Sequence, residues 1–121
     1  MKPRFKGGPN IAMKVPPHQH AATVAFYRDV LALEALDAST DDTVVFKFGN
    51  SKLWIDKVNT VSQAEIWLQV VTDDSAGADR LLNKAGIARC DEIEPLPDGF
   101  DGFWISNPAS IVHLIDGAGN P

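Results

Sequence analysis

The chain carries the same order of predicted elements twice, and this internal repeat restricts its fold more than any other feature. Matching Asn10 to Glu65 gives an offset of 55 residues, and matching Asn50 to Asn107 gives an offset of 57. Each half reads as a strand, a helix and then two or three strands. The repeat predicts an α+β fold made of two β-α-β-β-β modules, over residues 10–58 and 64–116, within a single domain over 1–121.

In the first module, alternating apolar residues predict a strand over residues 10–15. Apolar residues at helical spacing predict a helix from Ala21 to about Glu34. Pro16 and Pro17 separate these two elements, because proline cannot donate to a strand ladder. A strand is expected next over residues 36–39, where the pattern is weakest. Two further strands, over 43–48 and 52–58, are expected to form a hairpin around the turn-forming Gly49-Asn50-Ser51.

In the second module, a segment rich in Ile, Trp, Leu and Val predicts a strand over residues 65–71. Asp73-Asp74-Ser75 predicts the start of a helix, because such side chains accept hydrogen bonds from the free amides of its first turn. Gly86 predicts its end, since glycine accepts the left-handed conformation there. The remaining segments are expected to be strands over 88–93, 103–106 and 111–115, with an irregular loop over 95–102.

Strand alternation predicts that each sheet has one face under a helix and one face turned to a shared cup. The residues expected under the helices are Ile11, Met13, Val15, Leu53, Ile55, Ile66, Leu68, Val70, Val112 and Leu114. The residues expected to face the cup are Asn10, Ala12, Lys14, Trp54, Asp56, Glu65, Trp67, Gln69, Ile111, His113 and Ile115. The free faces would join into a curved mixed sheet with a cup-shaped site.

The composition excludes several classes of protein. With 11 basic and 16 acidic residues the formal charge is −5, which argues against a nucleic-acid partner. A single cysteine, Cys90, excludes an intrachain disulfide and a multi-cysteine zinc site. No apolar run is long enough for a membrane helix, and the basic first residues lack the apolar segment of a signal peptide. We therefore expect a soluble, cytoplasmic protein.

Several motifs resemble the vicinal oxygen chelate superfamily, which includes glyoxalase I, extradiol dioxygenases, and fosfomycin- and bleomycin-resistance proteins. The matching segments are Asn10–Val15, Phe26-Tyr27-Arg28-Asp29-Val30-Leu31, Val70–Asp73, Leu81–Gly86 and Asn107–His113. The last of these is similar to the Asp-Pro-x-Gly-Asn turn before the family's final strand. In detail the chain looks most like bleomycin-resistance proteins. The resemblance spans residues 10–116 and implies paired modules with a cup-shaped site, often in homodimers.

The resemblance also implies where a metal would bind. The positions that match the family's ligands are Asn10, Asp56, Glu65 and either His113 or Leu114, because the last turn is one residue shorter than the family pattern. Strand alternation favours His113. Asn10 stands where the family usually has His or Gln, and an amide is a poor ligand for a transition metal.

Three functions are open at this stage. The first is a metal-free binding protein of the bleomycin-resistance type, which sequesters a cationic or aromatic compound in an acidic cup lined by tryptophans. Its ligand-binding residues are expected to be Lys14, Trp54, Asp56, Glu65, Trp67, Gln69 and His113. The second is a glyoxalase-like lyase or isomerase, or a dioxygenase, with a divalent metal held by Asp56, Glu65 and His113. A third possibility is an interaction module that acts through its dimer surface.

Each candidate residue also has an ordinary structural interpretation. Glu65 and Asp56 would pair with Lys14 and Lys57, while tryptophans often fill a core, above all Trp104. His18 and His20 are expected to lie at a solvated helix entry. Cys90 is expected to be a buried, inert thiol.

Overall fold

The computed structural model describes residues 2–120, which form two compact units. One unit is Pro9–Trp67, and the other joins the residues up to Gly8 with those from Leu68 onward. Strands β1 (Phe5–Val15) and β4 (Glu65–Thr72) each have residues in both units. We describe each unit by itself.

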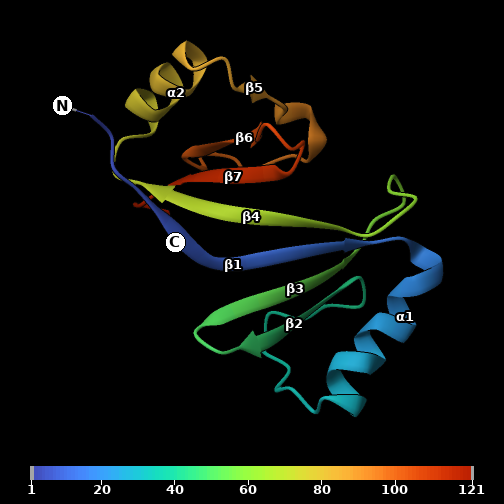
Figure 1. The fold of residues 1–121 in the computed structure, drawn as a ribbon. Coiled ribbons are helices and arrows are strands. Elements are labelled where there is room, and N and C mark those ends of the chain that lie inside the picture. The colour runs from blue at the N-terminus through green and yellow to red at the C-terminus, as the bar shows by residue number, and fades with distance from the viewer. Residues whose placement is uncertain (1, 121) are drawn as a thin grey trace. The chain divides into compact units, whose positions relative to one another are not determined.

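The Pro9–Trp67 unit contains a small mixed sheet with one helix (Figure 1). Strand β3 (Ser51–Lys57) pairs in parallel with β1 and antiparallel with β2 (Thr43–Phe48). The helix α1 (Pro17–Ala25) continues into a short π-helical turn, η1 (Phe26–Val30), and α1 packs against β3. The predicted β2–β3 hairpin and its turn at Gly49 are confirmed.

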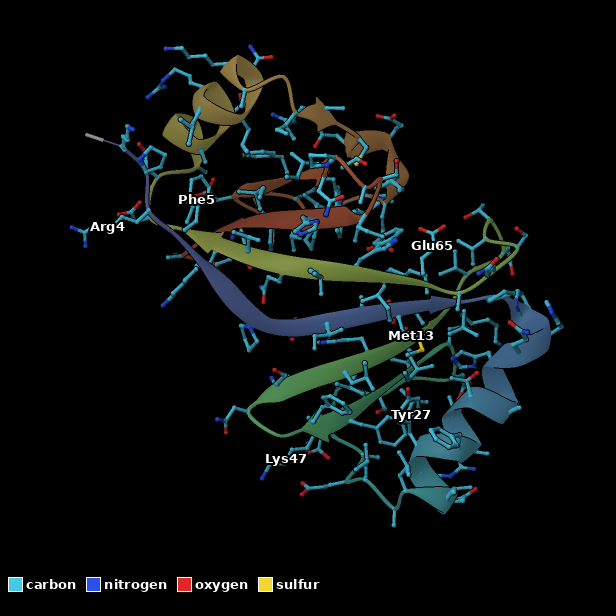
Figure 2. The ribbon with its side chains drawn as sticks, viewed as in Figure 1. Arg4, Phe5, Met13, Tyr27, Lys47 and Glu65 are labelled. Atoms are coloured by element: carbon cyan, nitrogen blue, oxygen red, sulfur yellow. The ribbon has the colours of Figure 1, made fainter. Side chains whose placement is uncertain are left out.

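The core of this unit lies between α1 and the sheet. Val15, Val24, Phe46, Leu53 and Ile55 are buried together, and the side chains packed against them include Ile11, Met13, Tyr27, Leu33 and Val44. Figure 2 shows Met13 on β1 and Tyr27 on η1 in this region. Strand alternation therefore places Asn10, Lys14, Trp54 and Asp56 on the opposite face, as predicted.

The second unit also combines one helix with a mixed sheet. Strand β7 (Val112–Gly117) pairs in parallel with β4 and antiparallel with β6 (Gly102–Ser106), which continues to the short β5 (Ala88–Arg89). Helix α2 (Ser75–Lys84) begins after Asp74, whose Oδ1 accepts a hydrogen bond from the Gly77 amide at 2.9 Å. A 3-10 turn, η2 (Asp91–Ile93), follows β5. The predicted helix start and its end at Gly86 are confirmed.

The core of the second unit lies between α2 and the sheet, where Ala78, Phe103, Ile105 and Ile115 are buried together. Each unit thus combines a helix with parallel and antiparallel strands, which confirms the predicted α+β class. Within residues 2–120, no helix is long and apolar enough to cross a membrane.

Four predicted elements differ from the structure. The first strand begins at Phe5 rather than at residue 10. The first helix begins at Pro17 rather than Ala21, because proline is well suited to the first helical turn, and α1 ends at Ala25. The predicted strand over 36–39 is wrong: that region contributes a single bridge between Ala35 and Phe46. The predicted strand over 88–93 is two residues long and gives way to η2.

Candidate small-molecule-binding face

The Pro9–Trp67 unit gathers polar and aromatic side chains on the sheet face opposite α1. We call this set the tryptophan face, and its members are Asn10, Lys14, Trp54, Asp56, Glu65 and Trp67. They come from β1, β3 and the first residues of β4. The parallel register sets Lys14 beside Asp56 and Ala12 beside Trp54. Figure 2 marks Glu65 at the beginning of β4.

Lys14 lies at the centre of this face and is buried, with an exposed fraction of 3%. Its Nζ donates to Asp56 Oδ2 at 2.7 Å and lies 4.3 Å from the centroid of the Trp67 ring. A buried ammonium is costly unless it is paired, and the carboxylate and the electron-rich ring both supply negative potential. Lys14 therefore fixes Asp56 and Trp67 in place.

The two indole N–H groups of the face are also satisfied. Trp54 Nε1 donates to Asn10 Oδ1 at 2.8 Å, and Trp67 Nε1 donates to Glu65 Oε1 at 3.0 Å. These hydrogen bonds orient both rings. Trp67 is buried, whereas Trp54 is half-buried next to the small side chain of Ala12. Trp54 is therefore the ring of this face with more surface open to a ligand.

Glu65 and Asp56 differ in their electrostatic surroundings. The charge of Asp56 is balanced by Lys14, while Glu65 is exposed and forms no ion pair with any residue between 2 and 120. The three charged groups leave this face with a net charge of one negative unit, located at Glu65. A cationic ligand group would therefore meet Glu65 rather than Asp56.

Gln69 belongs to the other unit and makes a different set of contacts. Its Nε2 donates to Asp116 Oδ2 at 2.7 Å, and its side chain occupies the space that a Cβ on Gly8 would need. Asn120 Nδ2 donates to the second oxygen of Asp116 at 2.7 Å. The role of Asp116 had no signal in the sequence, because it follows an apolar run with no motif around it.

The predicted facing of the last strand is wrong. Ile115 was expected to face the cup, but it is buried with Ala78 of α2. Since β7 is regular from Val112 to Gly117, His113 lies on the same face as Ile115, while Leu114 and Asp116 lie on the face opposite α2. Leu114 thus holds the position left open for the fourth metal ligand. His113 is half-buried, and its Nδ1 lies 3.1 Å from the Ile111 carbonyl oxygen.

The donor set does not fit a divalent metal. Lys14 already places a cation on Asp56, and the side-chain oxygen of Asn10 accepts from Trp54. Among residues 2–120, no three His, Cys, Asp or Glu side chains are grouped closely enough to hold a metal ion. A metal on Asp56 would have to displace the Lys14 ammonium.

The remaining candidates have structural roles. His20 was expected at a solvated helix entry, but it is buried, with Nε2 3.0 Å from the Ile55 carbonyl oxygen. The expectation was wrong because the helix begins at Pro17, three residues before His20, and carries His20 onto its packed side. Trp104 is buried, and its Nε1 donates to the Glu94 carbonyl at 2.9 Å. Partial burial, together with nearby Glu92, raises the pKa of the Cys90 thiol, which disfavours the reactive thiolate.

Comparison with known proteins identifies the fold. No protein-family model matches the chain, and no curated protein matches it either. Among solved structures, the Mn(II)-bound glyoxalase from Novosphingobium aromaticivorans has a TM-score of 0.63 at 19% identity, covering 95% of this chain and 40% of that one. A glyoxalase/bleomycin resistance protein/dioxygenase superfamily member from Vibrio splendidus 12B01 has a TM-score of 0.59 at 13% identity, covering 94% and 99%.

Homoprotocatechuate 2,3-dioxygenase from Arthrobacter globiformis is similar as well, with a TM-score of 0.63 at 16% identity, covering 96% of this chain and 37% of the dioxygenase. The chain therefore has the fold of the vicinal oxygen chelate superfamily, which confirms the predicted resemblance at the level of the fold. It spans less than half of the glyoxalase and of the dioxygenase. Because one fold serves many activities, function must be argued from the site.

Proposed function

We propose that the protein binds a small molecule of the planar aromatic type on its tryptophan face, without a metal ion, in the manner of bleomycin-resistance proteins. The ligand is best held when it also carries a positive charge. Sequestration of such a compound would protect a cell from it. The observation that carries the proposal is the exposed, unbalanced Glu65 carboxylate held against the indole of Trp67.

The aromatic part of the ligand is expected to contact Trp54. This ring is half-buried and is held by its hydrogen bond to Asn10, so little conformational entropy is lost when a ligand stacks on it. A ligand cation over Trp67 would compete with Lys14, which already lies over that ring. Glu65 is therefore the expected partner of the ligand's positive group.

A metal-dependent lyase, isomerase or dioxygenase is the less favoured function. Such enzymes need several open ligands around one ion. Here Asp56 is paired with Lys14, and Asn10 is bonded to Trp54. If the unaltered protein bound stoichiometric metal and the Glu65→Gln variant did not, the metal-dependent enzyme would become the favoured function.

A homodimer in the cytoplasm completes the proposal. Self-association is supported by apolar side chains left exposed around η1, namely Phe26, Val30 and Leu31. Sedimentation velocity over a range of concentrations should show a dimer. A monomer at every concentration would remove this part of the proposal and leave the ligand site unaffected.

The binding test compares two ring systems of the same shape. Calorimetric titration at pH 8 with EDTA present uses 9-aminoacridine as the planar cation and acridine as its neutral analogue. We expect both to bind the unaltered protein, the cation more tightly. Trp54→Leu should weaken both by at least about fivefold, because the stacking surface is lost. Glu65→Gln should weaken the cation alone, by about two- to fivefold.

Glu34→Gln is the matched control, because Glu34 is exposed and lies outside the tryptophan face. It removes one negative charge and should leave both affinities unchanged. If Glu34→Gln and Glu65→Gln weakened the binding of 9-aminoacridine equally, the effect would come from the net charge of the chain and not from the position of Glu65. No binding of either acridine would remove the support for an aromatic ligand.

A further inference from the structure

A pocket in the other unit shares no residue with the tryptophan face. Its volume is about 370 Å³, and it is lined by Arg4, Phe5, Lys6, Val71, Thr72, Asp73 and Ala118. These residues come from the N-terminal end of β1, the end of β4 and the segment after β7. Figure 2 labels Arg4 and Phe5 where β1 begins. The volume falls within the range of small-molecule sites, which begins at about 300 Å³.

The net charge of this pocket is opposite in sign to that of the whole chain. The protein has a formal charge of −5, yet two basic side chains line one small pocket. Within the part of the chain that the structure describes, neither Arg4 nor Lys6 forms an ion pair with a carboxylate. An unpaired guanidinium and ammonium at one pocket favour an anion.

The position of Arg4 is fixed by its backbone. Its N–H donates to Asp73 Oδ1 at 2.8 Å, which ties the start of the chain to the segment between β4 and α2. That hydrogen bond partly satisfies the Asp73 carboxylate. Counting Arg4, Lys6 and Asp73, the pocket keeps one net positive charge, enough for a monoanion but poorly matched to a polyphosphate.

The walls of the pocket are largely apolar. Phe5 is 39% exposed, and Val71 and Ala118 add aliphatic surface. Apolar walls with a few charged groups are typical of sites that bury the body of a ligand and anchor one polar end. An inorganic anion would leave this surface in contact with water.

We propose that this pocket binds a small organic monocarboxylate with an apolar body, its carboxylate held by Arg4 and Lys6 and its body resting on Val71 and Ala118. The site is independent of the tryptophan face and does not rest on the function proposed for that face. It would give the protein a second ligand of opposite charge preference.

The test uses benzoate as the carboxylate, with benzyl alcohol and benzylammonium as neutral and cationic analogues. In calorimetric titrations of the full chain, benzoate should bind more tightly than either analogue and more weakly as salt is added. The double variant Arg4→Gln/Lys6→Gln should bind benzoate at least about fivefold more weakly. The matched control is Arg80→Gln/Lys84→Gln, which removes the same charge from exposed positions on α2 and should have no effect.

Three results would overturn this inference: no benzoate binding to the unaltered protein, equal binding by the two double variants, or loss of benzoate binding in Trp54→Leu. The last result would place benzoate on the tryptophan face. Amide signals of Thr72 and Ala118 in a two-dimensional NMR spectrum should move with benzoate, which locates the ligand without a substitution. Failure here leaves the acridine experiments unaffected, so the two proposals fail separately.

Discussion

The two modules place very different side chains at equivalent positions. In both, the first strand pairs in parallel with the last, and the registers set Lys14 beside Asp56 in one module and Gln69 beside Leu114 in the other. The first pair is a buried ion pair of 2.7 Å. The second pair has no charge, and Gln69 instead donates to Asp116. One backbone pattern thus supports an ion pair at this position in one unit and an uncharged pair in the other.

The two modules are alike on the side of the sheet that packs under the helix and differ on the opposite side. The apolar side under each helix follows the same alternation in both modules, because it must fill a core. The opposite side is free of that requirement. Its charged pair, its two bonded indoles and its exposed carboxylate gather in the Pro9–Trp67 unit, which is why we assign ligand binding there.

The turns that precede the last strand of each module differ as well. Gly49 takes the left-handed conformation, with φ of +63°, while Ser110 adopts φ of +65° in the corresponding turn of the second module. Serine pays a steric cost there that glycine avoids. The Ser110 turn is held by Asn107, whose Oδ1 accepts from the amides of Ala109 and Ile111 at 2.8 and 3.0 Å.

Disruption of the ion pair between Lys14 and Asp56 is expected to have the largest effect on stability. Asp56→Leu copies the second module at one position and removes the Asp56 carboxylate from the Lys14 ammonium, whose side chain is 4% exposed. We expect the free energy of unfolding to fall by about 3 kcal/mol. Chemical denaturation measures it.

The double variant Lys14→Gln/Asp56→Leu copies the second module at both positions. Because the buried charge is removed with its partner, its stability should return to within about 1 kcal/mol of the unaltered protein. A double variant as unstable as Asp56→Leu would show that the face needs more than charge balance. We expect the double variant to fold, but the Trp67 ring loses its contact with the Lys14 ammonium and should be less well ordered.

The two turns predict a pair of opposite effects. Gly49→Ser should destabilise the protein by about 1 kcal/mol, since a Cβ at Gly49 meets no atom within 4 Å and only the backbone conformation is penalised. Ser110→Gly should stabilise it by about 0.5–1 kcal/mol for the same reason. Thermal unfolding of both variants checks the signs. Two shifts in the same direction would contradict this interpretation of the turns.

The two helix starts also differ. Asp74 caps α2, whereas Pro16 offers α1 no side-chain cap. Asp74→Ala should lower the free energy of unfolding by about 1 kcal/mol. Asp98→Ala, at an exposed loop position, serves as the control and should change nothing. An Asp74→Ala variant as stable as its control would mean that the cap adds no net stability.

How far the sequence could predict the structure depended on how cleanly apolar and polar residues alternate. In β1 they alternate without ambiguity, so the facing of Asn10 and Lys14 followed directly. Strand β7 has apolar residues on both faces, and the choice between His113 and Leu114 could be made only from its register with β4. The hydrogen bonds and the cation–π contact among side chains depend on rotamers, which residue spacing does not determine.

The most direct test of the central claim follows the indole N–H signals of the protein by NMR during titration with 9-aminoacridine in EDTA. Substitution of each tryptophan by phenylalanine assigns the three signals. We predict that those of Trp54 and Trp67 move in a saturable manner, because their partners Asn10 and Glu65 belong to the ligand site. If both signals stay in place, or move only after a divalent metal is added, the metal-free tryptophan face is not the binding site.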